Sequence, residues 1–190
     1  MQIKAFQNKI LTYYNEFGRD LPWRKTTDRY AIMVSEIMLQ QTQVDRVIPK
    51  YLAWLKAFPN VSALAAAPLS KVLELWSGLG YNSRAKRLQD AAKIIVEEYN
   101  NKIPDNPEEL IKLPGIGPYT ARSIVIFADN KNLATVDTNI RRILIHEFKL
   151  QENISDKELF NLAETILPKN KSRDWHNALM DFGATILTSK

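Results

Sequence analysis

Apolar residues recur at helical spacing along nearly the whole chain. The first segment carries them three or four positions apart, at Ile3, Phe6, Ile10, Tyr14 and Phe17. This spacing predicts a helix that stops at Gly18. Similar spacing predicts further helices over about 70–76, 83–100, 107–112, 118–129, 138–148, 155–167 and 174–187. One alternating run, LATVDTN, is compatible with an extended segment near 134–136. The pattern therefore predicts an all-α protein.

Another predicted helix lies within DRYAIMVSEIMLQQTQV, residues 28–44. It is apolar on nearly every side from Tyr30 to Leu39, and Asp28 is placed to cap its start. Glu36 interrupts the apolar run, and a buried carboxylate is costly unless it is paired or neutral. Glu36 is therefore either a core carboxylate paired with an arginine or a functional acid, and the run alone leaves both open.

Four of the six glycines form two similar phrases, SGLGYNSRAKR (Gly78, Gly80) and LPGIGPYTARS (Gly115, Gly117). Each phrase predicts a tight turn that opens a helix. Glycine lets a backbone approach a ligand closely, and amides at a helix start favour anions. Both phrases are also compatible with ordinary turns between helices. The second, with apolar anchors at Leu113 and Ile116, favours a hairpin that grips phosphate.

Composition narrows the class of protein. Lys and Arg number 26 against 21 Asp and Glu, a net charge of +5 that is compatible with a polyanionic partner. The chain has no cysteine, which excludes disulfides, thiolate catalysis and cysteine-ligated zinc or iron–sulfur clusters. No apolar run is long enough for a membrane span, and MQIKAFQNKI indicates an amphipathic helix rather than a signal peptide. We expect a cytoplasmic monomer without membrane contact, nucleoid-associated if the source is prokaryotic.

Asp137, in ATVDTNIRR, is a second candidate acid. Its position just before a predicted helix favours the simpler role of a helix cap. Two carboxylates that face each other in a cleft would instead suit hydrolysis of a glycosidic bond. One would stay protonated as the acid, and the other would stay ionised and stabilise positive charge on the sugar.

Six motifs between about residues 20 and 187 resemble the helix-hairpin-helix DNA glycosylases, and most closely their adenine branch. In chain order they are LPWR, YAIMVSEIMLQQTQV, WSGLGYNSRAKRL, LPGIGPYTA, VDTNIRR and NALMDFGA. The resemblance implies a two-lobed all-α fold with DNA across the cleft and the target base flipped between the lobes. One expected lobe is a six-helix type over 28–134 with the hairpin at about 107–128. The other combines 1–27 with 135–190.

The resemblance also implies roles for individual residues. Glu36 would protonate the leaving base, Asp137 would stabilise the sugar cation, Tyr119 would support the chemistry and Asn139 would supply a hydrogen bond. The base pocket would contain Trp23, Arg24, Val44 and Asn177. Contacts to DNA would come from Gln41, Thr42, Leu79, Tyr81, Arg84, Gly115, Gly117 and Arg122. Among these, Gln41 would wedge into the base stack, and Leu79 and Tyr81 would probe the opposite base.

Tyr119 stands where strand-cutting relatives carry a Schiff-base lysine, so a monofunctional glycosylase is expected. The expected substrate is double-stranded DNA with adenine opposite guanine or oxidised guanine. Val44 and Asn177 favour adenine, since the Asn177 amide offers a paired donor and acceptor, although it is shorter than the Gln or Glu typical of that branch. Thymine excision from T·G mismatches, or a non-catalytic DNA-binding module, remain alternatives.

Most of this family holds an iron–sulfur cluster through four cysteines near the last helix. Because the chain has no cysteine, we do not expect this cofactor. We also expect no metal site, although a monovalent cation at the hairpin is compatible with the resemblance. The last helix is then expected to hold by packing alone, through apolar residues such as Val125, Phe127, Leu179, Phe182 and Ile186.

Overall fold

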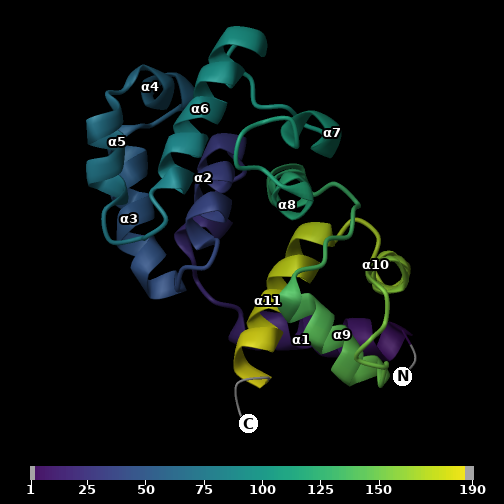
Figure 1. Cartoon of the computed structure of the whole chain (residues 1–190). Coiled ribbons are helices and arrows are strands. Elements are labelled where there is room, and N and C mark those ends of the chain that lie inside the picture. Colours follow the sequence, from purple (N-terminus) through teal and green to yellow (C-terminus); the bar gives the residue numbers. More distant parts are fainter. Residues whose placement is uncertain (1–2, 187–190) are drawn as a thin grey trace. The chain divides into compact units, whose positions relative to one another are not determined.

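The computed structural model describes residues 3–186, and this part of the chain is helical without a strand (Figure 1). The predicted all-α class is therefore confirmed. The elements are α1 (Ile3–Phe17), η1 (Pro22–Arg24), α2 (Arg29–Leu39), α3 (Val44–Ala57), α4 (Val61–Ala66), α5 (Leu69–Trp76), α6 (Ser83–Glu98), α7 (Pro107–Leu110), α8 (Pro118–Asp129), α9 (Thr138–Phe148), α10 (Asp156–Thr165) and α11 (Ser172–Ile186). None of these helices is long and apolar enough to cross a membrane.

The helices follow the predicted pattern closely. The first stops before Gly18, whose N–H donates to the Tyr14 carbonyl at 2.8 Å. The pattern did not predict α3 and α4, and α3 contains Pro49, a residue that ordinarily disfavours a helix interior. The run at 134–136 lies in neither a helix nor a strand. The predicted end of the last helix, Leu187, lies outside the described residues.

The chain divides into two compact units. Unit 2 is the continuous stretch Leu21–Asp129, and unit 1 combines the described residues 3–20 and 130–186. The predicted lobes place their boundaries at 27/28 and 134/135 instead. Residues 21–27 go with unit 2 because the Trp23 ring packs edge-on against Tyr51 of α3, with centroids 5.5 Å apart. Residues 130–134 go with unit 1, where the Ser172 hydroxyl donates to the Leu133 carbonyl at 2.8 Å.

In unit 2, helix α2 is packed against α3, α6 and α8 (Figure 1). Most of its side chains are buried, which explains why the sequence from Tyr30 onward is apolar all round. The Asp28 carboxylate accepts from the Tyr30 N–H at 2.9 Å, which confirms the predicted cap. The Tyr30 hydroxyl donates to the Phe58 carbonyl and accepts from the Trp54 indole. These bonds fix the start of α2.

In unit 1, helices α1, α9, α10 and α11 share one core. Its large members include Phe6, Ile10, Leu144, Trp175 and Phe182. The sequence suggested that α11 is held by packing alone, and this expectation is wrong. The buried Asp181 carboxylate accepts from the Arg19 Nε at 2.6 Å and from the Arg19 backbone N–H at 2.9 Å. This ion pair ties α11 to the segment that directly follows α1.

Candidate active site

Glu36 lies in the third turn of α2. Within residues 30–38 it is the one position whose side chain is not buried, since its neighbours Ser35 and Ile37 are each 1% exposed. The sequence led us to expect a buried Glu36 carboxylate, and the structure corrects this to a partly exposed one. A partly accessible carboxylate on an otherwise enclosed helix is what an acid needs if it is to meet a substrate.

The second glycine phrase forms the turn between α7 and α8. Gly115 has φ of +81°, and a Cβ there would lie 3.1 Å from the Arg87 Cβ. Both predicted anchors are buried, Leu113 at 3% exposure and Ile116 at 4%. Gly117 is exposed and directly precedes Pro118, the first residue of α8. Tyr119 is the second residue of α8 and is half-buried.

Helices α2 and α8 pack against each other within unit 2. The Gln40 side-chain amide donates to the Thr120 hydroxyl at 3.4 Å, next to Tyr119 in the chain. The elements that carry Glu36 and Tyr119 are thus neighbours. Arg122 lies one turn further along α8 and is half-buried.

Two loops of unit 2 carry the residues predicted to probe DNA. Gln41 and Tyr81 both have left-handed backbone, with φ of 55° and 47°, and both are exposed. Thr42 is half-buried, and its hydroxyl donates to the Gln40 carbonyl at 3.2 Å. The Leu79 side chain is only 4% exposed. The predicted pair is therefore corrected: Leu79 belongs to the core in this structure, and Tyr81 is the member that reaches the surface.

Arg84 also differs from the prediction of a phosphate contact. It is 8% exposed, and its guanidinium donates to backbone carbonyls and to the Thr42 hydroxyl within unit 2. Its role is therefore corrected to an internal one.

The predicted base-pocket residues come from both units. Trp23 and Arg24 lie in η1, with Trp23 buried and Arg24 half-buried. Val44 is the half-buried first residue of α3. These three belong to unit 2, whereas Asn177 lies on α11 of unit 1 and is 7% exposed.

Asp137, in unit 1, is the N-cap of α9. Its Oδ1 accepts from the Ile140 N–H at 2.7 Å, which confirms the cap that the sequence favoured. The amide of the exposed Asn139 lies 3.4 Å from Oδ2. Burial raises the pKa of Asp137 above its ordinary value, against the opposing effect of hydrogen bonds from Ile140 and Asn139. The cap uses Oδ1, and the Asn139 side-chain amide lies beside Oδ2.

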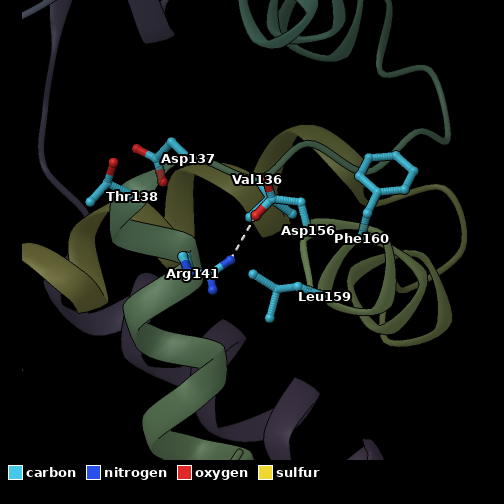
Figure 2. A pocket seen from close by; sticks show the side chains of 7 residues that line it. All are labelled: Val136, Asp137, Thr138, Arg141, Asp156, Leu159 and Phe160. Carbon is cyan, nitrogen blue, oxygen red and sulfur yellow. Dashed lines mark hydrogen bonds and ion pairs between the residues drawn. The ribbon is translucent and has the colours of Figure 1, made fainter. Parts of the chain in front are cut away.

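A cavity of about 390 Å³ adjoins Asp137 (Figure 2). It lies between the start of α9 and helix α10, and its lining combines apolar with charged side chains. The lining residues are Val136, Asp137, Thr138, Arg141, Asp156, Leu159 and Phe160. Arg141 is directed at Asp156, 2.8 Å away, and also donates to the Ile154 carbonyl. The Arg141 guanidinium is thus paired with the Asp156 carboxylate rather than with that of Asp137.

His176 has a structural role, because it supports the segment that leads to Asp137. Its Nε2 accepts from the Thr135 N–H at 3.1 Å, and its Nδ1 donates to the Ser172 carbonyl at 2.7 Å. Burial lowers the pKa of His176 to about 4, so the ring is neutral near neutral pH. The sequence does not identify the partner of His176, because Thr135 lies 41 positions away.

Residues 3–186 contain no cluster of three or more His, Cys, Asp or Glu side chains that could hold a metal ion. The iron–sulfur cluster implied by the resemblance does not fit this chain either, since there is no thiolate to ligate it.

Residues 34–169 match the family described as HhH-GPD superfamily base excision DNA repair protein. The chain belongs to this family. The match covers Glu36, Tyr119 and Asp137, whereas Trp23, Arg24 and Asn177 lie outside it. Because one family pattern spans both units, the HhH-GPD assignment applies to α2, the α7–α8 hairpin and the start of α9 together.

Among the relatives of this HhH-GPD chain are several adenine DNA glycosylases. The one from Buchnera aphidicola subsp. Baizongia pistaciae is 42% identical over 98% of this chain and 54% of its own length. The Mycolicibacterium smegmatis protein is 40% identical over 96% of this chain and 63% of its own. The human protein is 37% identical over 98% of this chain and 37% of its own length. The chain thus spans between about a third and two thirds of these relatives.

Solved structures show the same HhH-GPD fold. A thermostable thymine-DNA glycosylase superposes with a TM-score of 0.92 at 33% identity, over 99% of this chain and 88% of that one. A non-covalent endonuclease III–DNA complex gives a TM-score of 0.85 at 19% identity, over 100% of this chain and 89% of that one. The second likeness supports the fold alone, whereas the first also supports membership of the family.

Proposed function

We propose that this chain is a monofunctional DNA glycosylase that flips mispaired adenine out of double-stranded DNA and hydrolyses its N-glycosidic bond. The observation that carries the proposal is its 37–42% identity to adenine DNA glycosylases over nearly all of its length. Partial exposure of Glu36 and the cavity beside Asp137 are both consistent with it. Its partner is DNA with adenine opposite guanine or oxidised guanine, and it acts as a monomer in the cytoplasm or nucleoid.

In the proposed reaction, Glu36 donates a proton to a ring nitrogen of the adenine as the bond to the sugar breaks. The electron pair of that bond leaves with the base, and the sugar becomes an oxocarbenium-like cation. Asp137 stabilises this cation as a carboxylate. Water then adds to the anomeric carbon, and the proton it loses replaces the one that Glu36 donated. The products are free adenine and an abasic site. Asn139, beside the Asp137 carboxylate, is placed to orient it.

Tyr119 limits the reaction to this one step. A phenol cannot form the Schiff base through which a lysine would cut the strand, so the abasic product stays intact. The reaction needs no iron–sulfur cluster, and a cation at the hairpin carbonyls would assist phosphate binding rather than base release. The hairpin glycines Gly115 and Gly117, with Arg122, would grip the backbone while Gln41 and Tyr81 enter the base stack.

Thymine excision from T·G mismatches is the second candidate. It is favoured by the thymine-DNA glycosylase likeness, which extends over 99% of this chain and 88% of the solved one. The 33% identity of that pair is lower than the identity to the adenine enzymes, and we therefore rank it second.

The deciding experiment is single-turnover incubation with duplexes that contain A·G, A·oxidised guanine or T·G, followed by alkaline cleavage of abasic sites. We expect cleavage only after alkali, and on the adenine strand. Glu36→Gln serves as the control, because it should bind the duplex but release no base. Cleavage of the T·G duplex alone would establish the thymine activity. Mismatch binding without any abasic product would establish a non-catalytic DNA-binding module.

A further inference from the structure

Two loops of unit 2 lie beside Arg84, near the start of α6. One follows the end of α2 and contains Gln41 and Thr42. The other follows the end of α5 and contains Leu79, Gly80 and Tyr81. Each presents an exposed residue with left-handed backbone, Gln41 in the first and Tyr81 in the second. We call them the glutamine loop (residues 40–43) and the tyrosine loop (residues 77–82).

The Arg84 guanidinium contacts both loops at once. Its Nη1 lies 2.7–3.0 Å from carbonyl oxygens at the end of α2, those of Ile37, Met38 and Gln40. Its Nη2 lies 3.0–3.1 Å from oxygens in the two loops, those of Thr42 (hydroxyl), Leu79 and Gly80. The planar group thus joins three segments that are up to 47 positions away in the sequence.

Local structure explains why an arginine is needed here. The last carbonyls of a helix have no helical partners, and those of Ile37 and Met38 at the end of α2 take hydrogen bonds from Arg84. The guanidinium also lies 5.2 Å from the Trp76 ring centre and 5.7 Å from that of Tyr81. A lysine keeps the charge but lacks the planar fork that reaches several acceptors in fixed directions.

We propose that Arg84 is a positioning residue that holds the glutamine loop and the tyrosine loop together as one rigid probe of the DNA base stack. The proposal rests on the proposed function only in taking DNA as the molecule that the two loops contact. Because both Nη atoms of Arg84 contact internal oxygens, they are not directed at a phosphate. Its Nε is buried without an acceptor among the described residues, so it does not reach DNA either.

The test is Arg84→Lys, which keeps the positive charge and removes the fork. Hydrogen exchange of the free protein, followed by mass spectrometry, should show faster exchange in peptides covering both loops and unchanged exchange in α8. Single-turnover base release should fall about 10- to 100-fold, as expected when reacting groups are misplaced. Affinity for a fully paired duplex should stay within about twofold, with the same salt dependence, since phosphate contacts persist.

Arg29→Lys is the matched control. Arg29 also forms a two-pronged contact, with Asp129 at 2.9 Å through both Nε and Nη2, but at the opposite end of α2. This variant should show wild-type exchange in both loops and wild-type base release. If Arg84→Lys does not fold, Thr42→Val removes one of the Nη2 contacts and should accelerate exchange in both loops to a smaller extent.

Each outcome decides between the alternatives. Wild-type exchange of both loops in a folded Arg84→Lys protein overturns the proposal. The Arg84→Met variant separates a further alternative. If the salt dependence of its DNA affinity falls by about one phosphate contact while exchange of both loops is unchanged, Arg84 is a DNA ligand instead. Faster exchange with undiminished base release would refute the link to base probing. If the wild type releases no base at all, the proposed function fails, while the exchange measurements still test the positioning role.

Discussion

A carboxylate at a helix N-cap must offer an oxygen to a backbone amide, and Asp137 does so with Oδ1. Its Oδ2 lies 3.4 Å from the Asn139 side-chain amide, and the residue also lines the cavity at the start of α9. The two oxygens can therefore serve different purposes. Helix capping and stabilisation of a sugar cation are compatible roles for the same side chain.

Asp137→Asn should separate these roles. Asparagine caps helices about as well as aspartate, so the free energy of unfolding should change by less than about 0.5 kcal/mol. Loss of the negative charge should slow single-turnover base release by about 100-fold or more. Asp137→Ala is the comparison, because it should lose base release and also about 1 kcal/mol of stability in urea denaturation. A near-normal rate for Asp137→Asn would remove this carboxylate from the mechanism.

Helix α11 is bonded to the segment that precedes Asp137 and α9. His176 on α11 holds the Thr135 N–H through the unprotonated Nε2, so protonation of that nitrogen would destroy the bond. The fold thus requires a neutral imidazole.

The pH dependence of stability should reveal this requirement. The pKa of His176 is lowered from 6.5 to about 4 in the folded state, so the unfolded state binds more protons between these values. The contribution of His176 is complete above pH 6.5 and should be lost as the pH falls towards 4, by a total of about 3 kcal/mol. Urea denaturation at pH 7, 5.5 and 4.5 measures it. His176→Gln should flatten the profile, whereas His146→Gln, at an exposed site, should not. Equal profiles for wild type and His176→Gln would contradict the assignment.

Local elements were predictable from the sequence because their causes are local. The Asp28 cap, the end of α1 and the buried anchors Leu113 and Ile116 all depend on residues within a few positions. The internal role of Arg84 and the identity of the residues that His176 binds were not predictable. Their partners lie as many as 47 and 41 positions away, and only the packing of helices brings them together.

At the scale of the whole molecule, unit 2 is continuous in sequence and unit 1 is not. Contacts between α1 and the last helices therefore close very long loops. Lys9 on α1 bonds both oxygens of the Glu147 carboxylate on α9, at 2.7 and 2.8 Å and across 138 positions. The Glu147 side chain is 4% exposed and Lys9 is 45% exposed, so the carboxylate depends on the lysine more than the lysine depends on it.

Lys9→Met should therefore destabilise unit 1 by about 3 kcal/mol, because it removes the main charge partner of a buried carboxylate. Hydrogen exchange should accelerate in α1, α9 and α11 and remain slow in α2. Glu147→Gln should cost less, since Lys9 can be hydrated, and Lys4→Met on the exposed face of α1 should have no effect. Equal acceleration in α2 would show that the two units unfold as one.

The split of unit 1 also has a consequence for synthesis on the ribosome. Helix α1 is made before the other described helices, yet the core around Phe6 and Ile10 is completed by residues of α9, α10 and α11, more than 120 positions later. Throughout that interval the apolar face of α1 lacks these partners, while residues 21–129 can already collapse. Nascent chains stalled before α9 should thus attract holdase chaperones at their leading helix.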